Sequence, residues 1–511
     1  MNRVHLSFLF LILVKTVCAQ VEQTGRIETP VRIDAEAFSI VSLDTAGLLL
    51  YRNFVGSAEN QTELIRLDTS LQQKWRGFLP TPKTLQLKSV KSFANKIYFF
   101  FKNLIPGSQE FIVYTVNIKG GSYRSYTIKN VIQFNPTEYV VATNAILIGG
   151  YFNFRPLVLF FSLKEEKSHL LPGFLNEPGE ITQIESYPDG TSSVVTSAKN
   201  INGKKCIWIR HFDSDGEFLK TTIIEPEDNK NLIFGRVAKT DNNSQVVAGV
   251  YGRNSYFSRG LFVAEINEYG EYAVHYYNFG DLENFFHYMK AKREKRIKDR
   301  IERRHIKGKK IKFNYRFLVH ELITDGDQFI LTGEAFYPKY AGRSSYPNLS
   351  PYNSTSPWGY GPNARYYPPT YNRPNDLVFD GFQYTHAVAI GFDKNGTLKW
   401  DNSFEINGIK TFELEQYVKI VPRQNHIVLL YLYENLIRSK IIKDNQVIEG
   451  TTQNPVKTFN GQEQEAHGIR SNKLEHWFGN HFFAYGIQNL KDAEIPNQTR
   501  TVFFINKLSV R

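Results

Sequence analysis

Cysteine is nearly absent from this sequence. Only Cys18 and Cys206 occur in 511 residues, and Cys18 lies in an N-terminal segment that we expect to be removed. A chain left with one cysteine cannot form an internal disulfide, so its stability must come from a hydrophobic core. Cys206 stands in the largely apolar run 205–209, which predicts a small buried strand residue and not a reactive thiol.

Long apolar runs are also missing. Beyond the N-terminus, no segment approaches the roughly 18 consecutive apolar residues that a membrane-spanning helix needs. The chain opens MNRVHLSFLFLILVKTVCAQ, in which Arg3 precedes a nine-residue apolar run and Ala19 is a small residue before the expected cut. This pattern predicts a cleaved secretory signal over residues 1–19, leaving 20–511 as a mature protein that is secreted, periplasmic or at the cell surface. A lipid anchor on Cys18 is the alternative.

The common signatures of catalysis and metal binding are absent as well. The sequence holds no Gly-x-Ser-x-Gly elbow, no Walker loop and no Cys/His metal spacing, and the pair His320-Glu321 lacks the second histidine of a zinc helix. The segments that begin at Asp213 and Asp393 resemble the start of a calcium-binding loop but lack the remaining ligands. We therefore predict that they form tight turns. We therefore predict no metal, no cofactor and no catalytic residue, and we favour a protein that is not an enzyme.

The positive charge is confined to one block. The formal net charge is +12, but residues 289–312, MKAKREKRIKDRIERRHIKGKKIK, hold 13 Lys or Arg against 3 acidic residues. Arg3 and Lys15 of the expected signal account for the remaining excess, so the rest of the mature chain is neutral overall. This distribution of charge excludes a generally basic protein, because the excess positive charge of the mature chain lies in a single segment.

Short strand-like segments recur with a period near 49 residues. Each repeat opens on an apolar anchor, usually after a turn rich in Asn, Asp, Gly or Ser, and the anchors are spaced by 49, 49, 48, 52, 83, 98 and 55 residues. A further strand, a tight turn and another strand follow each anchor. Five of the seven spacings match the length of a four-stranded propeller blade. The anchors are Leu48, Ile97, Ile146, Val194, Val246, Phe329, Ile427 and Phe482.

This repeat predicts an all-β fold, a single β-propeller of about eight four-stranded blades over residues 20–511, with seven blades as the fallback. The last unit ends in TVFFINKLSVR and has no room for its outer strand, whereas residues 25–33 are strand-like and belong to no blade. We expect 25–33 to complete the last blade and so remove the open sheet edges. The two long spacings then mark insertions, a helical one at 281–312 and a Tyr/Pro-rich one at 337–380.

Two hairpins carry a family resemblance. In LDTSLQQKW and FDKNGTLKW, Asp68 and Asp393 precede Trp75 and Trp400 by seven residues, as in the Asp…Trp hairpin of quinoprotein-like propeller repeats. Over residues 36–511, the chain resembles exported bacterial β-propeller repeat proteins of uncharacterised type. The other units lack the Trp, so the resemblance implies the fold and carries over no quinone ligand, no calcium ligand and no activity.

The first insertion predicts a basic helix. Over residues 281–307, apolar residues recur at helical spacing, with Asp281 as the expected N-cap and Gly308 as the stop. Such a helix would gain modest support from charge pairs four residues apart. The expected pairs are Glu294 with Lys298 and Asp299 with Arg303.

Three roles remain open for this helix: a solvated face, a docking arm for an acidic protein, glycan or lipid surface, or a nucleic-acid binder. An exported protein rarely meets nucleic acid and no DNA- or RNA-binding motif is present, so we do not expect that partner. Peripheral membrane contact would need bulky aromatics beside the charges, and Phe285, Phe286 and Tyr288 occur only at the expected helix start. The predicted partner-binding residues are Lys292, Arg293, Arg296, Arg300, Arg303 and Arg304.

The second insertion is rich in tyrosine and proline. Residues 337–375 hold eight Tyr, eight Pro, one Trp, four basic residues and no acid. Proline and glycine disfavour helix and β-ladder, so we expect a long loop emerging within a blade. Its rings suit sugar or peptide partners, while a lid packed on the propeller fits the composition equally well. The predicted ligand-binding residues are Tyr352, Trp358, Tyr360, Tyr366 and Tyr367.

Together these features predict an exported binding or scaffold protein, at the cell envelope or outside the cell, that recognises a protein or glycan partner. The alternative is a propeller enzyme acting on glycans or small metabolites, with its site at the axis of the ring. Carboxylates and histidines that converge at the axis would favour the enzyme, and an apolar or aromatic axis would favour binding. The sequence does not indicate the oligomeric state.

Overall fold

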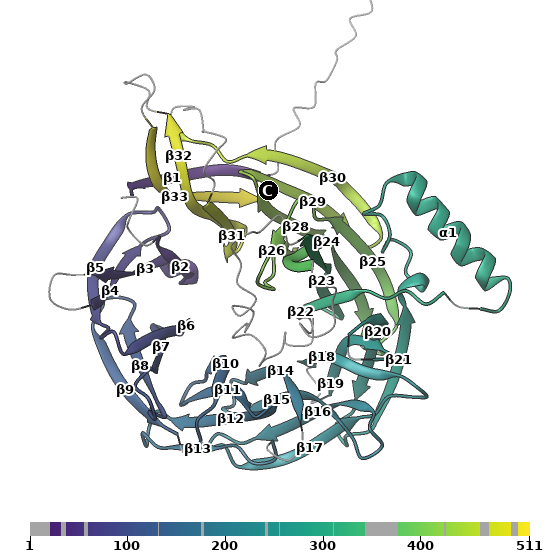
Figure 1. The fold of residues 1–511 in the computed structure, drawn as a ribbon, viewed down its shortest axis with the longest axis horizontal. Coiled ribbons are helices and arrows are strands. Elements are labelled where there is room, and N and C mark those ends of the chain that lie inside the picture. Colours follow the sequence, from purple (N-terminus) through teal and green to yellow (C-terminus); the bar gives the residue numbers. More distant parts are fainter. Residues whose placement is uncertain are drawn as a thin grey trace, which may run out of the picture.

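The protein is a ring of eight antiparallel sheets (Figure 1). The computed structural model describes residues 21–31, 37–55, 60–130, 132–174, 178–240, 244–254, 256–309, 311–342, 377–423, 426–459, 470–491 and 499–510. Seven sheets have four strands, and the sixth blade along the chain gains a short fifth strand. The chain is therefore an eight-bladed β-propeller, and the eight-blade prediction is confirmed.

The strands of the first four blades follow one another along the chain, from the innermost to the outermost. Blade 1 holds β2 (Ser39–Ser42), β3 (Leu48–Val55), β4 (Asn60–Leu67) and β5 (Gln73–Pro80). Blade 2 holds β6 (Leu85–Phe93), β7 (Lys96–Asn103), β8 (Glu110–Asn117) and β9 (Tyr123–Lys129). Blade 3 holds β10 (Asn135–Val141), β11 (Ala145–Phe152), β12 (Arg155–Ser162) and β13 (Ser168–Leu170). Blade 4 holds β14 (Gly179–Ser186), β15 (Ser192–Lys199), β16 (Lys205–Phe212) and β17 (Phe218–Ile224).

The remaining blades carry the insertions and the closure. Blade 5 holds β18 (Asn231–Lys239), β19 (Gln245–Gly252), β20 (Ser258–Ile266) and β21 (Tyr272–Asn278). Blade 6 holds β22 (Arg316–Asp325), β23 (Gln328–Gly342), β24 (Leu377–Asp393) and β25 (Leu398–Glu405), with β26 (Lys410–Thr411) paired to β24. Blade 7 holds β27 (Lys419–Arg423), β28 (His426–Tyr433), β29 (Leu436–Lys443) and β30 (Gln446–Pro455). Blade 8 holds β31 (Arg470–Phe478), β32 (His481–Lys491), β33 (Thr499–Val510) and β1 (Val21–Pro30).

The apolar anchors of the repeat mark the second strand of every blade. Each anchor lies within the first three residues of that strand, from Leu48 in β3 to Phe482 in β32. A second strand has sheet neighbours on both sides and packs against adjacent blades on both faces. Its residues are therefore apolar in unbroken runs and do not alternate with polar ones, as in β11 and β19, where nearly every residue is buried.

The N-terminal strand closes the ring. β1 pairs antiparallel with β33 and forms the outermost strand of blade 8, so the first and last strands of the chain share one sheet. Its bounds, Val21–Pro30, begin earlier than the expected segment 25–33. Arg26 fixes the strand from its centre, because its guanidinium donates to Asn506 Oδ1 at 2.7 Å and to Gln488 Oε1 at 2.8 Å.

The inserted helix is shorter than expected. Helix α1 spans Ala291–His305, and the expectation that it starts at Asp281 is wrong. Residues Phe279–Asp281 form the short 3-10 helix η2, in which Asp281 is the third residue of a capping box. The following residues Leu282, Phe285 and Phe286 are buried in the core between blades 5 and 6. Burial of these three side chains in the core overrides the helical periodicity of the segment.

The two expected charge pairs of this helix have different outcomes. Glu294 pairs with Lys298 at 2.8 Å, as predicted. Arg303 instead donates from Nε to the backbone carbonyl of Asp299 at 3.0 Å, so the second pair is not formed as an ion pair. The helix ends at His305, and Gly308 follows with a left-handed φ of 62°, which a glycine adopts without strain.

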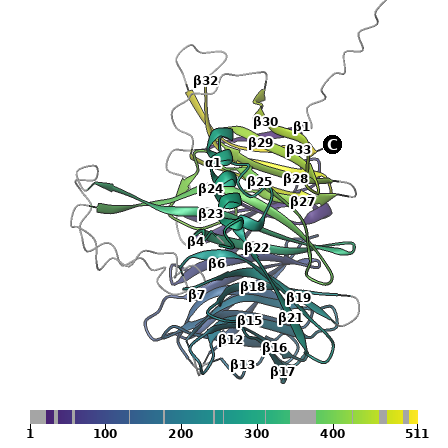
Figure 2. The same cartoon turned by 90° about the vertical axis from the view of Figure 1, so that its right-hand side faces the viewer.

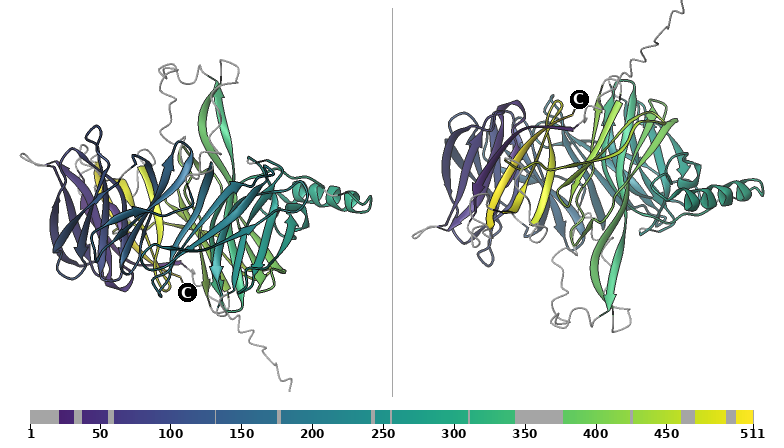
Figure 3. Two further views of the ribbon diagram at one scale, coloured as in Figure 1. Left: turned by 90° about the horizontal axis from the view of Figure 1, so that it is seen from below. Right: turned by 90° about the horizontal axis from the view of Figure 1, so that it is seen from above.

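The Tyr/Pro-rich insertion is partly sheet. β23 and β24 pair out to Gly342 and Leu377, so residues 337–342 and 377–380 are strands and the expectation of loop there is wrong. Pro338 is accommodated because the register of the ladder shifts between it and Tyr340. The resulting hairpin projects from one face of the ring (Figures 2 and 3).

The helix projects in a different direction from the hairpin. It extends outward from the rim, beside blades 5 and 6 (Figures 1 and 3). None of its residues is fully buried, but Ile297 and Ile301 pack against the core between those blades. Among the described residues, no helix is long and apolar enough to cross a membrane.

The minor sequence predictions agree with the structure. Asp213 and Asp393 each close a tight turn, their Oδ1 atoms accepting backbone N–H groups of the same turn. Cys206 is fully buried in β16, and burial raises the pKa of its thiol to about 11. His320 and Glu321 lie in strand β22, not on a zinc-binding helix.

Candidate functional site

Of the sequence-predicted site residues, the structure describes only the basic residues of α1. The basic residues of α1 lie on the rim, whereas the strands that surround the axis lie at the opposite edge of each blade (Figure 1). Tyr352, Trp358, Tyr360, Tyr366 and Tyr367 fall outside the described residues, so their role stays a prediction.

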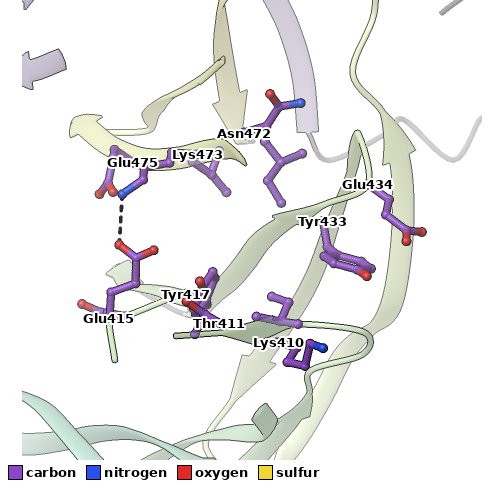
Figure 4. Close-up of a pocket in the computed structure, with 13 residues that line it drawn as sticks. Lys410, Thr411, Glu415, Tyr417, Tyr433, Glu434, Asn472, Lys473 and Glu475 are labelled. Carbon is purple, nitrogen blue, oxygen red and sulfur yellow. Dashed lines mark hydrogen bonds and ion pairs between the residues drawn. The ribbon is translucent and has the colours of Figure 1, made fainter. Parts of the chain in front are cut away.

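A pocket that the sequence did not indicate lies on the face from which the hairpin projects. Its volume is about 610 Å³, and it lies between blade 7, the first strand of blade 8 and the link 406–418 that joins blade 6 to blade 7 (Figure 4). Such a volume falls within the roughly 300–1,000 Å³ of typical ligand sites. The lining residues are Ile409, Lys410, Thr411, Glu415, Gln416, Tyr417, Leu432, Tyr433, Glu434, Asn472, Lys473, Leu474 and Glu475.

The buried carboxylate of Glu334 fixes one end of the link. It lies on β23 with no solvent exposure and accepts the backbone N–H groups of Val418 at 2.6 Å and Tyr417 at 3.1 Å. His320 Nε2 lies 3.0 Å from its second oxygen. A buried carboxylate needs several such partners, and here two of them are the backbone of the pocket wall itself.

Tyr384 fixes the middle of the link. Its hydroxyl donates to the carbonyl oxygen of Glu415 at 2.8 Å and accepts the N–H of the same residue at 3.2 Å. Burial, followed by the nearby Glu334 carboxylate, raises the pKa of Tyr384 above its usual value. The phenol therefore stays protonated and keeps its donor. Glu415 is thus held by its backbone, which leaves its side chain directed at the pocket (Figure 4).

The pocket wall is also joined to the projecting hairpin. β26 pairs with β24 through Thr411 opposite Phe382 and Lys410 opposite Gln383. Lys410 Nζ lies 2.8 Å from the carboxylate of Asp380, which is further along β24 toward the tip. The foot of the hairpin and one side of the pocket are therefore one structural unit.

Two further ion pairs include residues that line the pocket. Lys473 Nζ, on the first strand of blade 8, lies 3.0 Å from Glu415 Oε2 on the link, and both side chains are nearly half exposed (Figure 4). Lys419 pairs with Glu475 at 2.6 Å on the neighbouring inner strands. An exposed pair contributes little to stability. The pocket therefore offers a ligand a lysine and a carboxylate, side by side and accessible, with Tyr417 and Tyr433 as flat surfaces.

A second group of charges faces the axis of the ring. Arg236 on β18 is coupled electrostatically to Glu138 on β10, Glu185 on β14 and Glu321 on β22, all on first strands. β10 and β18 belong to blades that are not adjacent. Their side chains can therefore meet only on the axial side. The axis carries carboxylates and a guanidinium and is not a smooth apolar or aromatic surface.

Burial dominates the acid–base behaviour of this axial group. It raises the pKa of Glu138 and of Glu185 above their usual values and lowers that of Arg236. Within the described residues, the guanidinium of Arg236 makes no hydrogen bond or ion pair, and its Nε is shielded from solvent. The described residues contain no group of three or more His, Cys, Asp or Glu placed to hold a metal ion.

Sequence reasoning missed the pocket for an identifiable reason. The excess spacing between Phe329 and Ile427 points mainly to the Tyr/Pro-rich stretch, although the 13 residues between β25 and β27, 406–418, also contribute to it. The length of that link, between two otherwise regular blades, was the available signal. Nothing in the sequence indicates that residues 472–475 lie opposite it.

Comparisons with known proteins do not identify the family of this chain. No family model matches the chain, and no curated protein matches it. A solved polysaccharide lyase is similar, with a TM-score of 0.39 and 10% identity over 83% of this chain and 90% of that one. The WD40 domain of SCAP from fission yeast is similar with a TM-score of 0.39 and 9% identity, over 96% of this chain and 98% of that one. The β-propeller domain of the Trilobed protease from Pyrococcus furiosus is similar with a TM-score of 0.36 and 11% identity, over 84% of this chain and 96% of that one.

Proposed function

We propose that this chain is an exported binding or scaffold protein that recognises a protein or glycan partner at the cell envelope or outside the cell. Its recognition surface is the face that carries the pocket and the projecting hairpin. The observation that supports this most is the way the pocket is built. A buried carboxylate and a buried phenol hold the wall rigidly while Lys473 and Glu415 remain accessible.

Rigid presentation of accessible charges suits recognition. A ligand that meets Lys473 and Glu415 displaces a weak surface ion pair and gains two charge-assisted hydrogen bonds. The wall does not have to reorganise, so little conformational entropy is lost on binding. The hairpin, attached through Lys410 and Asp380, extends the same surface away from the ring.

The binding proposal is tested by reversing one charge in the pocket. Lys473→Glu places two carboxylates together, and Lys74→Glu does the same to the exposed Lys74–Asp68 pair on blade 1. We expect immobilised wild-type protein to recover a partner from envelope extract or to bind defined oligosaccharides on an array. Lys473→Glu should reduce that signal at least tenfold, and Lys74→Glu should leave it within about twofold. Equal signals from the two variants would contradict a site in this pocket.

The axial charges favour a second candidate, an enzyme acting on glycans or small metabolites. Glu138, whose pKa is raised by burial, has the character of a proton donor, and Arg236 is free to bind an acidic substrate group. Hydrolytic and lytic activity on a panel of neutral and acidic polysaccharides is the test. Activity in the wild type that Glu138→Gln abolishes, while Lys473→Glu retains it, would establish this function in place of the first.

A further inference from the structure

Helix α1 carries its cations on the face that turns away from the ring. Glu294, Ile297, Lys298 and Ile301 are the half-buried residues of the helix, and their spacing of three, one and three residues defines the face toward blades 5 and 6. Seven Lys and Arg residues lie on the remaining surface, all exposed; Lys295 is on the flank with Asp299 and Glu302, and the other six lie beside one another. The six are Lys292, Arg293, Arg296, Arg300, Arg303 and Arg304.

Four of these residues form a straight row. Lys292, Arg296, Arg300 and Arg303 are spaced by four, four and three residues, so they follow one line along the helix, with Arg293 and Arg304 on its flank. The whole set spans roughly 18 Å at 1.5 Å per residue. The exposed acids, Asp299 and Glu302, are on the opposite flank. The row is therefore a continuous line of positive charge, with about one cation per helical turn.

The cations of the row form no ion pair with acidic residues in the described part of the chain. Within the described residues, the side chains of Lys292, Arg296 and Arg300 make no hydrogen bond or ion pair, and the side chain of Arg303 bonds only to a backbone carbonyl of its own helix. The pair that does form, between Glu294 and Lys298, is on the inner side. Glu294 thus supports the inner face, and no acidic residue of the helix pairs with the outer row among the described residues.

The helix is rigidly attached to the ring. The buried carboxylate of Asp401 on β25 accepts the N–H groups of Glu283 at 2.9 Å and Asn284 at 2.8 Å, just before the helix. Tyr288 stacks on the buried His386, with ring centroids 3.8 Å apart and an interplanar angle of 5°. The segment that leads into α1 therefore has buried contacts on two sides, which hold the row at a fixed position on the rim.

We propose that this arginine row binds a linear anionic polysaccharide, one that carries repeated sulfate or carboxylate groups. Five of the six cations are arginine, whose planar fork makes two parallel hydrogen bonds to such groups. A row of evenly spaced cations on a rigid rod matches a polymer with evenly spaced anions, and basic clusters of this size are a recognised footprint of sulfated glycans. The site is on the rim, separate from the pocket, and does not depend on the function proposed for it.

The structure disfavours the other anionic partners. A membrane surface would require apolar side chains on the outward face, but Phe285 and Phe286 are fully buried and the outer row contains none. A protein interface would require an apolar or aromatic centre that excludes water, and the same face provides none. A polyanion requires only accessible cations, which are what α1 offers.

The test measures binding of the mature protein to dextran sulfate and to polygalacturonate, with neutral dextran as the control polymer, at 50 and 150 mM NaCl. We expect the wild type to bind both anionic polymers and not neutral dextran. The variant Arg296→Gln/Arg300→Gln/Arg303→Gln should lose at least tenfold in affinity. The slope of log affinity against log salt should fall by about 2, because fewer counterions are released.

A matched variant controls for net charge. Lys119→Gln/Lys164→Gln/Lys167→Gln removes three exposed cations from blades 2 and 3 and should stay within about twofold of the wild type. Lys473→Glu should also bind the polymers normally, which separates this site from the pocket. The proposal is overturned if the wild type does not bind at 50 mM NaCl, or if both triple variants lose equally. It is also overturned if phosphatidylglycerol vesicles or an acidic protein are bound more tightly than either polymer.

Discussion

At the scale of the residue, the structure depends on a few buried polar side chains that hold irregular segments to the regular blades. Glu334 and Tyr384 hold the pocket wall, and Asp401 holds the segment leading to α1. Each satisfies backbone N–H or carbonyl groups that no strand neighbour could reach. Insertions are tolerated in this ring because such residues provide the hydrogen bonds that the β-ladder does not.

The first prediction concerns Glu334. Replacing it with Gln removes the charge and leaves one acceptor oxygen for the N–H groups of Tyr417 and Val418, so we expect a loss of about 1–3 kcal/mol in the free energy of unfolding. Amide hydrogen exchange over residues 409–418 should become faster, while that of the blade strands changes little. Glu321→Gln, an exposed neighbour, should show neither effect. Unchanged exchange in the link would contradict this role for Glu334.

The second prediction concerns the pH dependence contributed by Asp401. Burial, the largest effect, raises the pKa of this carboxyl from 3.8 to about 6; Glu283 nearby adds to the rise, while the two N–H donors and Lys298 oppose it. The folded state thus holds the proton more tightly than the unfolded state. This contribution to stability is fully present below pH 3.8 and is lost as the pH rises through about 6.

Asp401→Asn removes this titration and so isolates it from the other groups. Urea unfolding of wild type and variant at pH 4 and pH 7.5 should show the variant gaining about 2 kcal/mol on the wild type as the pH rises. The comparison is needed because His211 and His386, whose pKa values burial lowers to about 4 and about 3, act in the opposite sense in acid. If the unfolding free energies of the two proteins change with pH in parallel, the pH dependence does not come from Asp401.

At the scale of the element, packing decides where the inserted helix begins and whether it persists. The helical periodicity over 281–307 is genuine, yet its first third is not helical because Leu282, Phe285 and Phe286 are each buried. The remaining 15 residues are too short and too charged to be a stable helix in water by themselves. The contacts of Ile297 and Ile301 with the core must therefore supply what intrinsic propensity does not.

The third prediction follows from those contacts. In Ile297→Ser/Ile301→Ser, the helix should lose its attachment, and amides of residues 295–305 should exchange at least tenfold faster. The ring should keep its melting temperature within about 2 °C, since no blade loses a buried residue. Arg296→Gln/Arg300→Gln, two substitutions on the outer face, should leave exchange unchanged. If the amides of the helix remain protected from exchange after the isoleucine substitutions, the helix is held by its ends alone.

At the scale of the whole molecule, the sequence predicts the ring well and the pocket not at all. Eight blades could be counted because each second strand is a buried apolar run that recurs at a fixed spacing, and a local pattern of that kind survives folding unchanged. The pocket is assembled from residues 409–411, 415–417, 432–434 and 472–475, whose proximity depends on ring geometry and on no local pattern. The helix start was misjudged because the burial of three side chains is a tertiary effect.

The last prediction concerns closure of the ring. Because β1 is the outer strand of blade 8, the ends of the chain are joined by one ladder, and removing residues 20–30 exposes the edge of β33. It also leaves Asn506 and Gln488 without the guanidinium of Arg26. We expect the truncated protein to melt at least 10 °C lower and to associate through the open edge, as measured by calorimetry and light scattering.

A synthetic peptide of residues 20–31 provides the control for this loss. Since the missing strand makes its hydrogen bonds through the backbone and is fixed by Arg26, the peptide should add to β33, raise the melting temperature and suppress association. The same peptide with Arg26→Ala should do so more weakly, because it lacks the hydrogen bonds from the guanidinium to Asn506 and Gln488. If the truncated ring stays monomeric and melts like the full chain, closure by β1 does not hold the propeller together.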